Sequence, residues 1–113
     1  MLFVSSVRRS TEFYGQLGFA VKGSFAPPGT REFSWVRLES GSVSLMLARA
    51  AAPASAVEHS AVLYLYCDDV PAFRDMLVSN GVQCGAIQHP FHSPGGEFRV
   101  TDPDGYPWMI THP

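Results

Sequence analysis

The sequence has little charge and no long apolar run, and each scarcity excludes a class of protein. Charged residues make up 16% of the 113 residues, the net charge is -2, and no run of like charges occurs. Such a chain is not expected to bind nucleic acid or an anionic membrane by neutralising phosphates. The longest apolar stretches, such as Ala61–Cys67, are far shorter than a membrane span. We therefore expect neither nucleic acid nor a membrane as partner.

Cysteine is also scarce, and no targeting segment is recognisable. Cys67 and Cys84 are too few for a disulfide framework and are not spaced as a paired metal site. The residues after Met1 reach polar Ser5 without the charged start or cleavage site of a secretory signal. We expect two reduced thiols in a cytoplasmic protein. The length and an apolar fraction of 46% predict one globular domain over residues 1–113.

What the sequence does contain is one pattern written twice: a short strand, a helix of about ten residues, a glycine stop and further strands. Ser6 and Asp69 are helix N-cap residue types, and Gly18 and Gly81 suit the left-handed residue that ends a helix. Ser6 and Asp69 are 63 residues apart, as are Gly18 and Gly81. The equal separation predicts an internal repeat.

After each predicted helix the apolar period changes to two, which is typical of strands. The strands expected there are 33–38, 42–47, 98–101 and 108–111. The alanine-rich segment 49–58 is expected to be a linker, which gives modules of about 1–48 and 59–113. The sequence thus predicts an α+β fold of two βαβββ modules, with a ferredoxin-like sandwich as the alternative.

Three motifs in these modules carry a resemblance to a known family. Residues 7–19, 64–70 and 97–106 resemble, in order and spacing, the glyoxalase, bleomycin-resistance and extradiol-dioxygenase superfamily, also called vicinal oxygen chelate. The resemblance covers nearly the whole chain and implies that each module forms a half-barrel and that the paired modules form a cleft. Because this scaffold hosts isomerases, dioxygenases, thiol transferases and drug-binding proteins, the resemblance implies a fold more than a reaction.

The same resemblance implies where a metal would be held. Metal-dependent members place His, Gln or Glu on the first and last strand of each module. In this sequence these positions fall on Val62, Met109 and Met46, and the fourth lies upstream of Met1. Valine has no donor atom, and a thioether suits Cu(I) rather than Zn, Ni, Fe or Mn. We expect no metal and no other cofactor.

Strand alternation then sorts the remaining side chains, because residues in phase with the ligand positions should face the cleft. The predicted ligand-binding residues are Trp35, Arg37, Met46, Val62, Tyr64, Tyr66, Arg99, Thr101 and Met109. Aromatic walls with a few polar groups are typical of a site for an organic molecule. Methionine adapts to irregular shapes, and arginine can stack on a ring or pair with a carboxylate. The alternative is that these aromatic residues fill a dimer interface.

Two further features have ordinary interpretations. His89 and His92 are three apart, but Pro90 and the Ser-Pro-Gly-Gly run after His92 predict a surface loop or cleft rim rather than a helical metal pair. Glu97 could act as an acid or base at the cleft edge, although we expect it to be solvated.

Four functions stay open at this level. They are metal-independent binding of a flat or aromatic organic molecule, a metal-independent enzyme, a metal-dependent lyase, isomerase or dioxygenase, and a dimeric interaction module. In the enzyme alternative, arginine or tyrosine side chains would steady an anionic intermediate. The resemblance to bleomycin-resistance proteins favours the first function, in a homodimer whose crevices are lined by both chains.

Overall fold

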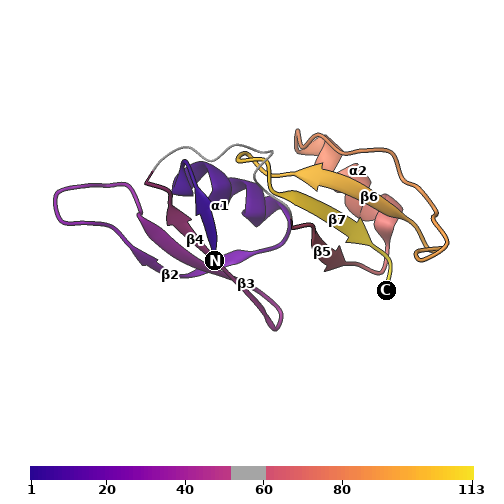
Figure 1. Cartoon of the computed structure of the whole chain (residues 1–113), viewed down its shortest axis with the longest axis horizontal. Coiled ribbons are helices and arrows are strands. Elements are labelled where there is room, and N and C mark those ends of the chain that lie inside the picture. The colour runs from indigo at the N-terminus through magenta and orange to yellow at the C-terminus, as the bar shows by residue number, and fades with distance from the viewer. Residues whose placement is uncertain (52–60) are drawn as a thin grey trace. The chain divides into compact units, whose positions relative to one another are not determined.

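The computed structural model describes residues 1–51 and 61–113, and the chain divides into two compact units, Met1–Ser55 and Ala56–Pro113 (Figure 1). Most of the expected linker 49–58 lies outside the described residues. The elements of the first unit are β1 (Leu2–Val4), α1 (Val7–Gln16), β2 (Ala20–Phe25), β3 (Trp35–Ser40) and β4 (Val43–Arg49). Those of the second are β5 (Leu63–Tyr66), α2 (Val70–Ser79), β6 (Glu97–Thr101) and β7 (Pro107–Thr111).

Each unit contains one sheet in which the first strand pairs in parallel with the last. The first sheet has the order β1-β4-β3-β2 and the second β5-β7-β6, with antiparallel pairing elsewhere. In the parallel pairs Phe3 lies beside Ala48 and Tyr64 beside Met109, a separation of 45 residues in both cases. The predicted α+β fold is confirmed, and the two sheets share the register of their parallel strands.

The second unit departs from the expected βαβββ pattern in one respect. The segment between α2 and β6 forms only isolated bridges, Cys84 to Val100 and Gln88 to Glu97, where a full strand was expected. Cys84 and Gln88 are four residues apart, whereas their partners Val100 and Glu97 are three apart, so the register slips between the two bridges. A segment interrupted in this way meets the edge of β6 at single points instead of along a continuous ladder.

The two helices begin and end as the sequence predicts. Ser6 Oγ accepts a hydrogen bond from Arg9 N at 3.2 Å, and Asp69 Oδ1 accepts one from Ala72 N at 3.0 Å. Gly18 follows α1 with a φ of 98°, a conformation that glycine adopts without steric cost. Neither α1 nor α2 is long and apolar enough to cross a membrane, and the described residues contain no other candidate.

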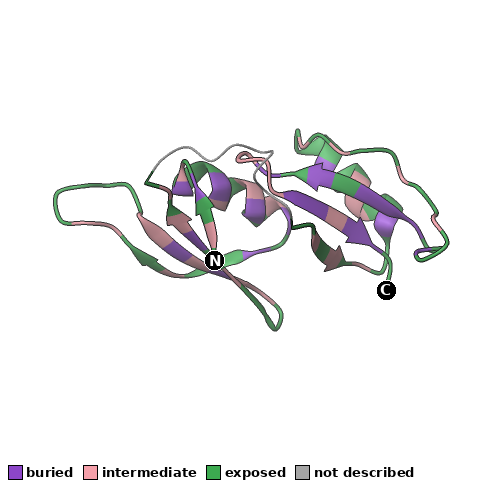
Figure 2. Ribbon diagram, in the orientation of Figure 1, coloured by how far each residue is buried: buried purple, intermediate pink, exposed green. Residues whose placement is uncertain are grey.

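One face of each sheet is buried beneath its helix. In the first unit Val36, Leu38 and Leu47 are fully buried with Tyr14 of α1. In the second unit the fully or almost fully buried residues include Leu77 of α2, Phe98, Val100 and Ile110. Strand alternation predicts that Val36, Leu38, Phe98 and Val100 point inward, and their burial confirms it. Figure 2 shows buried and exposed residues alternating along β6 from Phe98 onward.

Val43 does not follow this alternation. Strand alternation predicts Val43 in the core together with Leu45 and Leu47, but half of its surface is exposed. Val43 pairs with Ser40 beside the turn that joins β3 to β4. At this end of the sheet β4 extends past the buried residues Leu38 and Leu47. Strand alternation therefore no longer determines whether a side chain is buried there.

The close approach of Gly95 to the end of β7 gives a stability prediction. A Cβ atom at Gly95 would lie 2.6 Å from His112 Cγ and 2.7 Å from its Cβ. His112 cannot withdraw freely, because its backbone N donates to Gly96 O at 3.1 Å. Replacing Gly95 with alanine should lower the free energy of unfolding by about 1–3 kcal/mol, measured by urea denaturation.

Gly15 provides the matched control for this substitution. A Cβ at this position of α1 meets nothing within 4 Å, so Gly15→Ala should leave stability unchanged or raise it by up to about 1 kcal/mol. A second substitution, His112→Gly, removes both clashing atoms and should recover part of the loss in the Gly95→Ala chain. Equal effects of Gly95→Ala and Gly15→Ala on the free energy of unfolding would contradict the proposed clash.

Candidate functional site

The candidate site is built on the sheet faces that point away from the helices, which we call the outer faces. On the outer face of the first sheet, Trp35 has Phe25 as its neighbour on β2, and Phe3 lies in the same row beyond β4. Arg37 and Met46 are partners across β3 and β4 in the next row. Phe3, Phe25 and Met46 are exposed, and Trp35 is half-buried. This face is thus an aromatic surface with one thioether and one guanidinium.

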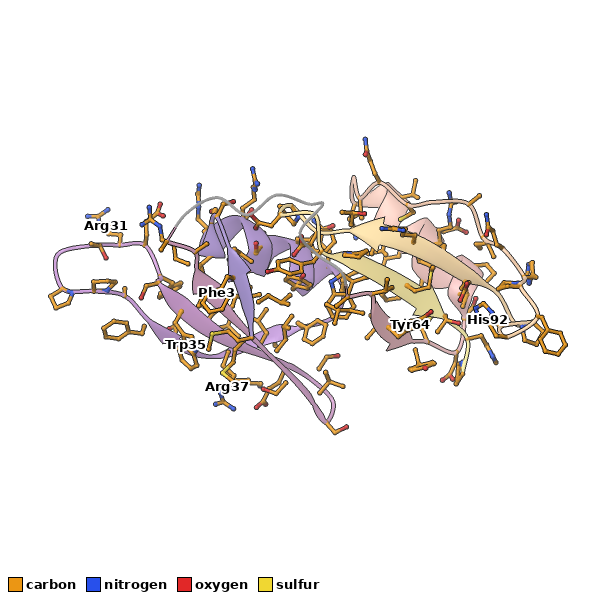
Figure 3. All side chains as sticks on the ribbon, in the orientation of Figure 1. Phe3, Arg31, Trp35, Arg37, Tyr64 and His92 are labelled. Atoms are coloured by element: carbon orange, nitrogen blue, oxygen red, sulfur yellow. The ribbon has the colours of Figure 1, made fainter. Side chains whose placement is uncertain are left out.

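A glycine on the neighbouring strand lets the indole ring lie close to the sheet. The ring of Trp35 is 3.6 Å from the point where a Cβ of Gly23 would stand. Gly23 follows a register shift in β2, which brings it opposite Arg37. Figure 3 shows Phe3, Trp35 and Arg37 together on this unit.

The guanidinium of Arg37 already has partners. Its Nη1 is 2.6 Å from Glu39 Oε1, and its Nη2 donates to Lys22 O at 3.5 Å. Both side chains are partly exposed, so the ion pair contributes little to stability. Arg37 is positioned by this pair, but its pairing with Glu39 competes with any anionic group of a ligand.

The outer face of the second sheet carries two adjoining rows. Tyr64, Met109 and Arg99 lie side by side across β5, β7 and β6, and Tyr66, Thr111 and Glu97 form the next row. The rings of Tyr64 and Tyr66 are stacked, with centroids 6.5 Å apart and planes inclined by 25°. Both tyrosines are exposed, and the guanidinium of Arg99 has no hydrogen bond or ion pair with any residue that the structure describes.

Two hollows open beside this second face. One, of about 270 Å³, is lined by Gly85, Ala86, Gln88, Glu97, Phe98, Arg99 and Met109. The other, of about 350 Å³, is lined by Gln83, Cys84, Gly85, Arg99 and Thr101. Arg99 and Gly85 belong to both. The larger volume is at the lower end of the range of small-molecule pockets, and the smaller one lies just below that range.

The predicted ligand-binding residues fall into three groups in the structure. Arg99, Thr101 and Met109 line the two hollows. The others on described strands lie on the outer faces: Trp35, Arg37 and Met46 on the first sheet, Tyr64 and Tyr66 on the second. Val62 precedes β5 and is exposed. The first unit has a further hollow of about 310 Å³, lined by Pro27, Thr30, Glu32, Phe33, Ser34 and Arg49, and it includes none of the predicted residues.

Sequence reasoning gave too little weight to Glu97. It was expected to be solvated, but its side chain is only 8% exposed. Glu97 Oε1 is 3.4 Å from His92 Nε2, and its Oε2 is buried with no partner among the described residues. The available signal was that Glu97 lies on the same face of β6 as Arg99. The burial of Glu97, however, depends on the loop before β6, which strand alternation does not predict.

Phe3 and Phe25 were also missed. Strand alternation, which turns Met109 toward the cleft, predicts the same orientation for Thr111 and an open position there. β1 is too short to show alternation, and the register shift in β2 disrupts it. Thr111 is buried, because its Oγ1 is 2.7 Å from Ser93 Oγ in the loop before β6. These three errors arise where loops or irregular pairing override the strand period.

The residues at the family's ligand positions do not fit a transition metal. Met46, Val62 and Met109 offer two thioethers and a hydrocarbon, and the residue directly beside Met109 is Tyr64. Zn, Ni, Fe and Mn favour imidazole and carboxylate ligands, which these positions lack. Within residues 1–51 and 61–113, no three His, Cys, Asp or Glu side chains are gathered so as to hold a metal ion.

The two cysteines are poor nucleophiles in this setting. Burial raises the pKa of the Cys67 thiol, and the nearby carboxylates of Asp68 and Asp69 raise it further. Burial also raises the pKa of the Cys84 thiol, against a smaller lowering by Arg74. Since the thiolate is the reactive form, neither residue suits covalent catalysis at neutral pH.

Comparison with known proteins agrees with this architecture. The family model of the Glyoxalase/Bleomycin resistance protein/Dioxygenase superfamily matches residues 1–110. The chain belongs to this superfamily. No curated protein matches the sequence.

Several solved structures share the fold at low sequence identity. A bleomycin-binding protein complexed with bleomycin is 20% identical with a TM-score of 0.74, covering 99% of this chain and 93% of its own. TnmS3, an antibiotic binding protein from Streptomyces sp. CB03234, is 24% identical with a TM-score of 0.76, covering 99% and 90%. The fosfomycin resistance protein FosX from Listeria monocytogenes is 9% identical with a TM-score of 0.77, covering 99% and 88%. At these identities the likeness establishes the fold.

Proposed function

We propose that this protein binds an organic molecule with a planar aromatic group, without a metal ion, on the outer faces of its sheets. The observation that carries the proposal is the row of aromatic residues on the first sheet, in which half-buried Trp35 lies between exposed Phe25 and, beyond Ala48, exposed Phe3. Fully burying such rings against a ligand is favourable, and stacked rings add about 0.5–1.5 kcal/mol per pair. The side chains at the family's metal positions support an apolar site in the place of a coordination site.

The second sheet supplies chemistry of the same kind. Tyr64 and Tyr66 present a stacked pair of rings, and Met109 lies beside Tyr64 with an adaptable thioether. The unpaired guanidinium of Arg99 can stack on an aromatic ring. Two solved structures with this fold are those of a bleomycin-binding protein and an antibiotic binding protein, which supports an antibiotic-like compound as the class of ligand.

The direct test is calorimetric titration of the purified protein with metal-free bleomycin and with 3-methylindole, a small neutral planar compound. We expect saturable binding of at least one of them, unchanged by EDTA. Amide signals of the outer-face residues should shift in NMR spectra as the ligand is added. Saturable binding that shifts only the signals of α1 and α2, or no binding of either compound, would refute the proposal.

Metal independence has its own test. Elemental analysis of protein purified without an affinity tag should find less than one Zn, Ni, Fe or Mn per chain, because Met46, Val62 and Met109 supply no hard or nitrogen donor. One tightly held transition metal per chain that protects Met46 or Met109 from oxidation would refute it. Metal lost on replacing His89 and His92 would instead be a surface contaminant.

We also propose that the protein is a homodimer. Many large apolar residues of the described chain are exposed, among them Phe3, Phe25 and Met46 on the first sheet and Val62, Tyr64 and Tyr66 in the second unit. Exposed apolar groups of this size commonly mark an interaction surface. A two-fold dimer would cover part of them and leave the rest to line the ligand site.

A further inference from the structure

The most unusual group on the outer face of the second sheet is the carboxyl of Glu97. A polar atom buried without a hydrogen-bond partner is rare in folded proteins and calls for an explanation. Glu97 Oε2 is such an atom, in a side chain that is 92% buried. The carboxylate form of a glutamate accepts hydrogen bonds and donates none, so the missing partner is a donor.

The nearby hydroxyl groups do not supply that donor. Thr111 is the cross-strand partner of Glu97, but its Oγ1 is 2.7 Å from Ser93 Oγ, and Ser93 Oγ also donates to Gly96 O at 3.2 Å. The backbone N of Glu97 is likewise engaged, since it donates to Gln88 O at 2.9 Å. The polar groups of the loop before β6 therefore have other hydrogen-bond partners, and Glu97 Oε2 is left without a donor.

The charged groups around Glu97 also leave it incompletely paired. His92 Nε2 approaches only Oε1, at 3.4 Å, and the His92 side chain is 65% exposed. Arg99 is two residues away on the same face of β6, yet it forms no ion pair with Glu97. A guanidinium that stays apart from an adjoining carboxyl is available for a different contact, such as stacking on a ring.

The unmatched oxygen belongs to a residue that lines a hollow. Glu97, Arg99 and Met109 all border the space of about 270 Å³ on this face. That volume suits one ring or a short amine side chain. Three side chains of different chemistry, a carboxyl, a guanidinium and a thioether, therefore border one small space.

From this arrangement we infer that a ligand bound on the outer face of the second sheet carries a protonated amine, which donates to Glu97 Oε2 while the adjoining aromatic ring packs against Arg99 and Met109. The inference rests on the proposed function and adds the charge of the ligand to it. Hydrogen bonds to a charged group in a partly desolvated site are about twice as strong as neutral ones, so the carboxylate would select amines among aromatic compounds of one shape.

The test compares three indoles of similar size by NMR and calorimetric titration: tryptamine with an ammonium group, neutral 3-methylindole, and anionic indole-3-propionate. We expect the wild-type protein to bind tryptamine about tenfold more tightly than 3-methylindole, and indole-3-propionate no better than 3-methylindole. Tryptamine should shift the amide signals of Gly85, Gln88 and Arg99, which border the hollow.

Two variants with the same change of net charge complete the experiment. Glu97→Gln keeps the shape of the side chain and should reduce the preference for tryptamine to about twofold or less. Asp75→Asn, at an exposed position of α2, should leave it unchanged. A preference that survives in Glu97→Gln, or is equally lost in Asp75→Asn, overturns the inference.

The wild-type protein alone also decides the question if Glu97→Gln does not fold. Equal affinity for tryptamine and 3-methylindole would overturn the amine inference and leave the proposed aromatic site standing; an ordered water on Oε2 would give that result. Tryptamine shifts confined to residues away from the hollow would overturn it as well. Binding of none of the three indoles, nor of bleomycin, would overturn the proposed function and this inference together.

Discussion

Replacing Phe98 with alanine should lower the free energy of unfolding by about 3–5 kcal/mol, because it removes a ring that is 1% exposed in the core of the second unit. Phe98 pairs with Ile110 across β6 and β7, and both lie on the face opposite to Arg99 and Met109. The loss is a large fraction of the 5–15 kcal/mol that stabilises a typical domain. Urea or guanidinium denaturation followed by circular dichroism measures it.

Phe91→Ala is the matched control, since it deletes the same ring from a fully exposed position in the loop before β6. Its effect should lie within about 0.5 kcal/mol of zero. Comparable losses from both substitutions would mean that the inward and outward faces of β6 are wrongly assigned, and the positions of Glu97 and Arg99 would then be exchanged with those of the core.

Replacing Trp35 with alanine should weaken the binding of a planar ligand about tenfold or more. The substitution removes a stacking partner and the apolar area of the largest ring on the outer face of the first sheet. Trp35 is half-buried against Gly23, so part of its surface is available to a ligand. Calorimetric titration with 3-methylindole or bleomycin, whichever the wild type binds, gives the affinity ratio.

Two further measurements identify the cause of that loss. Light scattering should report a dimer for both wild type and Trp35→Ala, because other exposed apolar residues remain to hold the interface. Phe91→Ala should bind the same ligand with wild-type affinity. Unchanged affinity in Trp35→Ala would place the site elsewhere, and a monomeric wild type would refute the proposed homodimer.

The helices and the regular strands could be predicted because residues close together in the sequence determine them. Ser6 and Asp69 identify both helix starts, and alternation correctly turns Val36 and Leu38 inward and Trp35 outward. These signals involve residues only a few positions apart. They do not depend on how distant segments meet, which is why one sequence is enough to derive them.

The parts that could not be derived depend on contacts between distant segments. The burial of Glu97 requires the loop at 89–96 to fold against β6 and β7, as the contact of Ser93 with Thr111 shows. The exposed position of Phe3 follows from the pairing of a three-residue strand with β4. Neither strand period nor residue type contains this information, so Glu97 was expected to be an ordinary solvated acid.

The strand order of the second sheet has a consequence for the synthesis of the chain. β7 is the central strand, and β5 and β6 pair with it but not with each other. While a ribosome is still adding residues 67–106, β5 has no strand of its own sheet to pair with, and its exposed edge is open to other chains. The first unit can complete its sheet once residue 49 has emerged, whereas the second must wait for residues 107–111. Folding of the two units is thus staggered, with the later one limited by its last strand.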